Sequence, residues 1–253
     1  MRRRTERRSA PLRWLLGLLT LGAALYVALR VQLTAPAAQA LLAGQALLGR
    51  KTVLAVVAHP DDLEWYIGGT LGALARRGAD VQVIVATDGE KGPNRVGATD
   101  LPTTRRAEQA AAGRLLGYRH IYSLGLPDRG VAASPRFLPE VKRIYRSVKP
   151  DAVFVFDPSY PSLPYLHTDH QGPARAFLSF WTTLGADRPP VYLFQTRRPG
   201  VAVDISDVLG VKAEALARHV SQNGGSGQRM TSFFAADGRR VGVGAAELFR
   251  LLR

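Results

Sequence analysis

Five apolar, β-branched runs alternate with helical patterns along most of the chain, and this alternation constrains the fold more than any other feature. The runs are TVLAVVA (52–58), VQVIVAT (81–87), HIYSL (120–124), DAVFVF (151–156) and VYLFQT (191–196). Helical patterns fall at 67–77, 104–116, 139–148, 172–182 and 209–219. Continuous apolar strands of this kind are typical of a parallel sheet covered on both faces. The sequence therefore predicts an α/β fold of Rossmann-like, doubly wound type, with a mostly parallel sheet between two helical layers.

The first 33 residues predict a membrane anchor helix. Six arginines within residues 1–13 precede WLLGLLTLGAALYVAL, residues 14–29, which carries no charge. A membrane span needs about 20 residues, and the run reaches that length if it extends to Leu33 with Arg30 snorkelling to the interface. The alternative is a signal peptide cleaved near residue 40, after the small-x-small triplet AQA.

The arginines also predict where the rest of the chain lies. Because positive residues stay on the cytoplasmic side, an uncleaved anchor places the following domain on the extracytoplasmic side of the membrane. Signal cleavage would instead give a secreted protein. We expect residues 34–50, which are rich in alanine and leucine, to form a short helix or tether that leads into the domain, and residues 51–253 to form the folded domain.

Charge and cysteine content exclude several functions. The formal net charge is +14, of which residues 1–13 supply +5, and the rest comes mostly from arginines scattered through helical stretches, with no basic run interleaved with aromatic residues. We therefore expect no nucleic-acid partner. The chain has no cysteine, which excludes disulfides, thiolate zinc sites and cysteine nucleophiles. Any metal must be held by His, Asp or Glu.

The polar residues that follow the first strand predict half of a metal site. The sequence His59-Pro-Asp-Asp comes directly after the strand, and the turn at Pro60 allows His59 and Asp62 to lie on one side. The alternative is that Asp61 or Asp62 only caps the following helix. In a doubly wound sheet, ligands bind beyond the carboxyl ends of the strands, which is where these residues lie.

The second half of the predicted site follows the fourth strand, in the sequence HTDH at residues 167–170. If the two strands are neighbours, His59, Asp62 and His170 converge as three ligands with a fourth position left for water, a composition typical of a catalytic site. Asp61 is then available as the base that takes a proton from this water. His167 would aid the oxyanion or the leaving amine, and Asp169 would hold the tautomer of one imidazole.

These motifs resemble the PIG-L/LmbE-like family of zinc-dependent N-deacetylases. AHPDDLEWYIGGTL resembles the family's AHPDD-E motif, TDGEKG its second strand end, RRAEQAAAGRLLG its Arg-x-x-Glu helix and HTDH its second metal motif. The family's glutamate, which in many members directly follows the two aspartates, stands one place later here, as Glu64. Thr168 stands where many members have proline.

The resemblance implies one Zn²⁺ ion, or another divalent metal, held by His59, Asp62 and His170, with Asp61 and His167 as catalytic residues. The implied reaction removes the N-acetyl group of an N-acetylglucosamine-type sugar. With the predicted anchor, the substrate would be an envelope glycan or glycolipid. The alternatives are an amidase acting on a non-acetyl or thiol-sugar conjugate, and a catalytically silent carbohydrate-binding surface protein.

Substrate contacts are predicted at four further positions. Arg105 matches the family's helix motif, although with Glu108 it also has the spacing of a plain ion pair. Asp88 ends the second strand and would border the pocket. Tyr160 and Tyr165 precede HTDH and would stack on a sugar ring, with ordinary packing as the alternative. His120 and His219 are expected to be structural or peripheral.

Overall fold

The computed structural model describes residues 14, 15, 17, 20, 22, 30–159 and 168–253. Residues 1–32 and 33–253 form two separate compact units, and the sheet belongs to the second. Most of the predicted membrane segment, residues 14–29, lies outside the described residues. Within the described part of the chain, no helix combines the length and the apolar character needed to cross a membrane.

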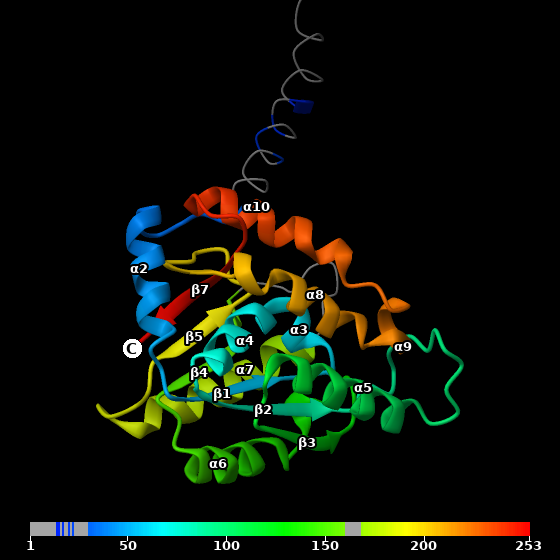
Figure 1. The fold of residues 1–253 in the computed structure, drawn as a ribbon. Coiled ribbons are helices and arrows are strands. Elements are labelled where there is room, and N and C mark those ends of the chain that lie inside the picture. The colour runs from blue at the N-terminus through cyan, green and yellow to red at the C-terminus, as the bar shows by residue number, and fades with distance from the viewer. Residues whose placement is uncertain (1–13, 16, 18–19, 21, 23–29, 160–167) are drawn as a thin grey trace, which may run out of the picture. The chain divides into compact units, whose positions relative to one another are not determined.

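A seven-stranded sheet forms the centre of the second unit (Figure 1). Its strands are β1 (Thr52–Val57), β2 (Asp80–Thr87), β3 (His120–Leu126), β4 (Ala152–Phe156), β5 (Val191–Phe194), β6 (Val201–Asp204) and β7 (Ala246–Leu252). The spatial order is β3-β2-β1-β4-β5-β7-β6. The first five strands pair in parallel, which confirms the predicted mostly parallel α/β sheet.

The two remaining strands were not expected from the sequence. Strand β7 pairs antiparallel with both β5 and β6. Strand β6 has only four residues, and β7 carries the charged Glu247 and Arg250. Neither therefore shows the continuous apolar run that marks the parallel strands. The carboxyl-terminal strand β7 thus lies between β5 and the edge strand β6.

Helices cover both faces of the sheet as separate layers (Figure 1). Helices α6 (Phe137–Val148) and α7 (Thr168–Trp181) pack together on one face, against strands from β1 to β4. Helices α3 (Asp62–Tyr66), α4 (Gly68–Arg76), α5 (Leu101–Leu116) and α8 (Leu209–Ala217) form the other layer. Helix α9 (Val220–Asn223) follows α8, and α10 (Thr231–Val241) packs on β7. Single 3₁₀ turns lie at Val131–Ala133, Thr182–Leu184, Ser206–Val208 and Gln228–Met230. This arrangement is the predicted three-layer architecture.

Residues 34–50, predicted to form a short helix or tether, contain helix α2 (Ala37–Leu47), and this helix packs directly on β6. A Cβ atom at Gly44 would lie only 1.9 Å from the carbonyl oxygen of Ala202, so glycine is needed for this close approach. The buried Ala40 also joins a small apolar cluster with Ala202 and Val241. The segment is thus part of the compact unit that begins at Leu33.

The order of the strands places a ligand crevice beside β1. The chain runs from β1 outward to β2 and β3, and then crosses to β4 on the other side of β1. Helices on the two faces leave the sheet in opposite directions at such a switch point, and ligands bind beyond the carboxyl ends of the strands there. The HPDD motif follows β1 and the HTDH motif follows β4, so both motifs reach this point.

Candidate active site

The turn after β1 is built around the carboxylate of Asp62. Its Oδ2 accepts hydrogen bonds from the backbone amides of Ala58, at 3.2 Å, and His59, at 2.8 Å. Its Oδ1 faces away from these amides and lies 3.3 Å from Nε2 of His170. Asp62 is 4% exposed, so one oxygen secures the turn while the other lies inside the site.

The first turn of helix α7 carries His170 into the same corner. The imidazole of His170 stacks on the ring of Phe156, the last residue of β4, with ring centroids 4.1 Å apart and planes 7° apart. The ring centroids of His170 and His59 lie 5.3 Å apart. The pairing of β1 with β4 therefore brings together two residues that are 111 positions apart in the sequence.

Negative charge at this corner favours a positive partner. Burial lowers the pKa of the His59 imidazole, but hydrogen bonds and charge from Asp128 and Asp62 outweigh it and raise this pKa to about 10. Burial raises the pKa of Asp62. This effect is outweighed by the positive charges of His170 and His59 and by the hydrogen bonds that both imidazoles make to Asp62, which hold the pKa well below its ordinary value. The corner therefore stabilises cationic charge although it is buried.

Two more carboxylates complete the surroundings of His59. Nε2 of His59 lies 3.0 Å from Oδ1 of Asp128 and 4.0 Å from Oδ2 of Asp169. Asp169 also accepts the amide hydrogen of Val131 through Oδ1 at 3.3 Å, while its buried Oδ2 has no hydrogen-bond partner among the described residues. The predicted contact of Asp169 with an imidazole thus falls on His59, at the edge of contact distance.

Sequence reasoning missed Asp128. This residue follows the end of β3 and is 3% exposed. Its Oδ2 accepts the amide of Lys91 at 3.2 Å, and its own amide donates to Glu90 at 2.8 Å. Its position directly after a parallel strand was the available signal, because that edge of the sheet is where a ligand binds.

Asp61 lies between the two predicted ligands of the turn and has an unusual backbone. Its φ of 97° is in the left-handed region, which residues other than glycine rarely adopt. Its side chain makes no capping hydrogen bond to α3, so the capping alternative does not describe Asp61. Burial raises the pKa of Asp61 to about 6, against the opposing charges of Arg105 and His219. A carboxylate with such a pKa is suited to take up a proton near neutral pH.

Arg105 holds the backbone around Asp61 and is almost fully buried. Its guanidinium donates to the carbonyl oxygens of Gly89 and Pro60 and lies 3.5 Å from Oδ1 of Asp61. Gly89 has φ of 64°, and a Cβ there would lie 2.1 Å from Nη1 of Arg105, so this loop requires glycine. Glu108 does not pair with Arg105, since its carboxylate accepts hydrogen bonds from the amide and hydroxyl of Ser221.

The other predicted substrate contacts have different fates. Asp88 lies at the end of β2 and forms an ion pair with the half-exposed Arg106. His167, Tyr160 and Tyr165 lie outside the described residues. Their predicted roles, like those of Arg105 and Asp88, stay predictions.

A second buried polar group that the sequence did not indicate lies beneath Asp61. His219, expected to be structural or peripheral, is fully buried, with Nε2 3.0 Å from Oε2 of the fully buried Glu64. Gln109 donates to both oxygens of Glu64, at 3.1 and 3.2 Å. No local pattern joins residues 64, 109 and 219, so only the fold reveals this group.

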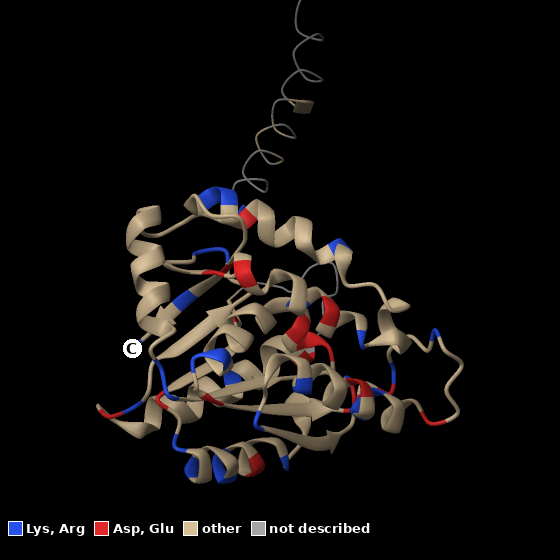
Figure 2. Ribbon diagram, viewed as in Figure 1, with Lys and Arg blue, Asp and Glu red and all other residues tan. Residues whose placement is uncertain are grey.

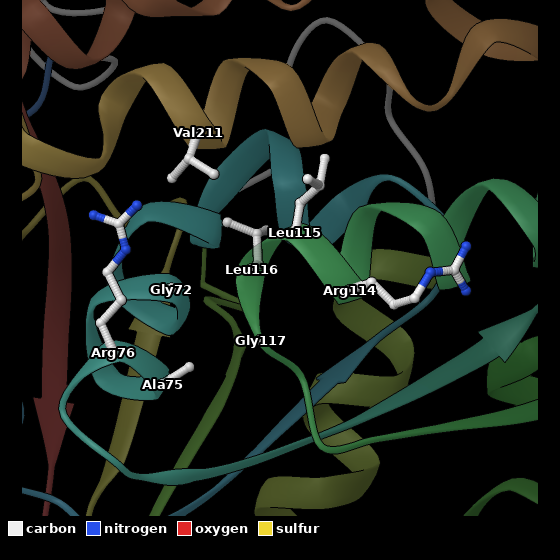
Figure 3. Close-up of a pocket in the computed structure, with 8 residues that line it drawn as sticks. All are labelled: Gly72, Ala75, Arg76, Arg114, Leu115, Leu116, Gly117 and Val211. Carbon is white, nitrogen blue, oxygen red and sulfur yellow. The ribbon is translucent and has the colours of Figure 1, made fainter.

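Acidic charge marks the candidate site. Acidic residues gather around α3 and the neighbouring strand ends (Figure 2). A pocket of about 210 Å³ lies elsewhere, where α4 and α5 end beside α8 (Figure 3), and Arg76 and Arg114 point away from each other at its two sides. Its lining is Gly72, Ala75, Arg76, Arg114, Leu115, Leu116, Gly117 and Val211. None of the predicted site residues lines it.

The donor set at the corner fits a divalent metal. The ligand atoms of His59, Asp62 and His170 all lie within 4.8 Å of one another, and all three residues are buried. Two imidazoles and one carboxylate are a ligand set that catalytic zinc uses, with one position left for water. A second group of the same kind, His59, Asp128 and Asp169, shares His59.

Comparison with known proteins identifies related deacetylases. Residues 54–181 match the PIG-L family model, described as GlcNAc-PI de-N-acetylase. The diacetylchitobiose deacetylase of Thermococcus kodakarensis is 30% identical over 192 residues, which cover 68% of this chain and 70% of that protein.

Solved structures share the fold. N,N'-diacetylchitobiose deacetylase from Pyrococcus horikoshii, bound to its inhibitor MPG, superposes with a TM-score of 0.71 and 27% identity, over 81% of this chain and 84% of that one. GalB, the 4-carboxy-2-hydroxymuconate hydratase of Pseudomonas putida, has a TM-score of 0.69 and 24% identity, over 80% of this chain and 96% of that one. At 24% identity, this second similarity concerns the fold alone.

Proposed function

Because this chain belongs to the PIG-L family, we propose that it is a metal-dependent N-deacetylase that removes the acetyl group from an N-acetylglucosamine-type sugar. The observation that carries this proposal is the convergence of His59, Asp62 and His170, with ligand atoms within 4.8 Å, beside an Asp61 that belongs to neither ligand group. The related proteins whose names specify such sugars support the substrate class.

His59, Asp62 and His170 would hold the metal, for which Zn²⁺ is the first candidate. A divalent metal bound there would polarise the acetamide carbonyl and lower the pKa of water. Asp61 takes the proton of the attacking water and directs it toward the leaving nitrogen. The carbonyl carbon gains the oxygen of water and loses the sugar nitrogen, so the products are acetate and a free amine. His167 aids the oxyanion or protonates the amine.

The substrate is proposed to lie in the cell envelope, as a glycan or a glycolipid. The support is the sequence of residues 1–33 alone, whose arginine cluster and apolar run favour an anchor with the domain on the extracytoplasmic side. Fusing a reporter that is active only in the cytoplasm to the carboxyl terminus tests this. An inactive reporter is expected, and an active one would contradict the proposed location.

The activity is tested with the purified full chain. It should release acetate from N,N'-diacetylchitobiose and from N-acetylglucosamine, lose this activity with a chelator and regain it with Zn²⁺. A panel that also contains propionyl and thiol-sugar amides separates a deacetylase from a broader amidase. If no amide in the panel releases its acid while the protein holds one metal ion per chain, the proposed reaction is wrong.

A further inference from the structure

Three buried polar side chains from distant parts of the sequence form one hydrogen-bond network beneath Asp61. His219 contacts Glu64, and Glu64 accepts two hydrogen bonds from Gln109. Glu64 and His219 are fully buried, and Gln109 is 2% exposed. The residues come from α3, from α5 and from the junction of α8 and α9, which pack against one another (Figure 1).

The hydrogen-bond network ends at the backbone amide of Asp61. Oε1 of Gln109 accepts the hydrogen of the Asp61 amide at 3.1 Å, while Nε2 of the same side chain donates to Glu64. The carboxamide of Gln109 is therefore fixed at both ends, and its orientation is set by Glu64. His219 in turn fixes Glu64 through Nε2, at 3.0 Å.

Asp61 needs such support because its backbone is strained. A non-glycine residue with φ of 97° is energetically unfavourable, and it persists only where the surrounding structure holds it. The Asp61 side chain makes no capping hydrogen bond of its own, and Arg105 contacts its Oδ1 only at 3.5 Å. The 3.1 Å hydrogen bond from the Asp61 amide to Gln109 therefore restrains the backbone of this residue and the direction of its side chain.

We propose that His219, Glu64 and Gln109 are positioning residues that hold Asp61 in its strained backbone conformation, and so aim its carboxylate at the substrate. This inference rests on the proposed function, in which Asp61 moves the proton. It assigns a role to the only histidine outside the two metal motifs that is fully buried among the described residues. It also explains why a glutamate follows the aspartate pair: its carboxylate faces Gln109 and His219, not the metal corner.

The first test replaces the residues at the two ends of the hydrogen-bond network, Gln109 and His219. Gln109→Met keeps the volume but loses the acceptor for the Asp61 amide, and His219→Ala removes the group that fixes Glu64. Each variant should lower kcat by about 10- to 100-fold, the range seen when residues that orient a metal site's groups are removed. KM and bound metal should stay unchanged, because neither side chain reaches the ligands or solvent.

Rescue and a matched control separate positioning from stability. His219→Gln restores an N–H donor toward Glu64 and should recover most of the lost kcat. Trp181→Phe removes one buried hydrogen bond, from Trp181 to the Pro189 carbonyl at 2.7 Å, at the opposite edge of the sheet. It should lower the melting temperature without changing kcat. Equal losses of kcat in Trp181→Phe and His219→Ala would overturn the proposal, as would a His219→Gln variant no better than His219→Ala.

A double-variant cycle distinguishes this inference from the proposed function. If Gln109 acts through Asp61, Gln109→Met should lower kcat in the wild-type background and have no further effect in an Asp61→Asn background. A fully active Asp61→Asn variant would disprove the role of Asp61 itself. An inactive Asp61→Asn variant together with a fully active Gln109→Met variant would be consistent with the proposed function but would contradict the positioning role of the hydrogen-bond network.

Discussion

The protein buries two clusters of charged residues, the Lys212–Glu247 pair and the corner of His59, Asp62 and His170. They differ in whether their positive and negative charges balance. Lys212 and Glu247 are 0% and 1% exposed, with Nζ 2.6 Å from Oε1. Glu247 also accepts the amides of Gly69 and Thr70 at the start of α4, and Lys212 lies 3.8 Å above the ring of Phe234. This pair compensates its own charge.

The corner of His59, Asp62 and His170 is different. There the carboxylates of Asp62, Asp128 and Asp169 surround two histidines, and Oδ2 of Asp169 has no hydrogen-bond partner among the described residues. A buried charge is costly unless it is paired. Buried charges that balance each other hold the fold together. An excess of buried carboxylates around imidazoles instead indicates that a bound cation balances their charge.

Removing a ligand should break this distinction most completely. His170→Ala should lose the bound metal and lower the rate of acetate release by more than about 100-fold, since even supporting residues of metal sites cost 10- to 100-fold. Elemental analysis and acetate assays measure both effects. The exposed His120 provides the matched control, because His120→Ala should keep metal and activity. A His170→Ala variant with full metal content would contradict the assignment.

Removing the base should separate chemistry from metal binding. Asp61→Asn should lower kcat by about 10²- to 10⁴-fold, the usual contribution of general base catalysis, while the metal content stays at the wild-type level. Asn is well suited to the left-handed backbone at this position, so the turn should be kept. Asp187→Asn, at an exposed site, is the control. A simultaneous loss of metal would indicate that Asp61 is instead a ligand.

Changes to the Lys212–Glu247 pair should lower the stability of the protein without lowering its activity. Lys212→Met leaves Glu247 buried without its partner and should lower the free energy of unfolding by about 3–5 kcal/mol, measured by urea denaturation. The double variant Lys212→Met with Glu247→Gln should recover part of this loss, because no unpaired charge is left. Turnover per folded molecule should be unchanged in both, and a selective loss of turnover would contradict a purely structural pair.

The smallest effect concerns the pH dependence of stability. Burial lowers the pKa of His219, but the hydrogen bond and charge of Glu64, with the charges of Asp61 and Glu108, outweigh it and raise this pKa above 6.5. The resulting stabilisation is fully present below the pKa of the unfolded chain and is lost as the pH rises through the raised value. Urea denaturation from about pH 6 to about pH 9 should therefore show wild type losing stability relative to His219→Gln. Parallel curves would contradict this.

The sequence predicted the parallel part of the fold because most of its strands, β1, β2, β4 and β5, are largely continuous apolar runs. It also predicted that His59, Asp62 and His170 converge, since both motifs follow strands and parallel neighbours end at one edge. Strands β6 and β7 were missed because β6 has only four residues and β7 carries the charged Glu247 and Arg250, so neither is a continuous apolar run. The packing of segment 34–50 into the folded unit was not predicted, because its small residues, Gly44 among them, show their packing role only against β6.

Parts of the site could not be predicted for a related physical reason. Asp128 is a single carboxylate after β3, and only the strand order β3-β2-β1 shows that it reaches His59. Glu64, Gln109 and His219 lie far apart in the sequence, and their contacts depend on how α3, α5 and the α8–α9 junction pack. Local motifs identify groups that share a turn, whereas contacts between layers appear only in the folded structure.

The stack of His170 on Phe156 has a consequence for how an ion is captured. An imidazole binds a metal in the plane of its ring, and a ring lying flat against Phe156 with planes 7° apart cannot tumble freely. Phe156 is itself a core residue of β4, so folding of the sheet fixes the direction from which His170 accepts an ion. The affinity of the proposed site for a metal would therefore depend partly on the hydrophobic core: a cavity made at Phe156 is expected to free the imidazole and weaken binding although every proposed ligand is still present.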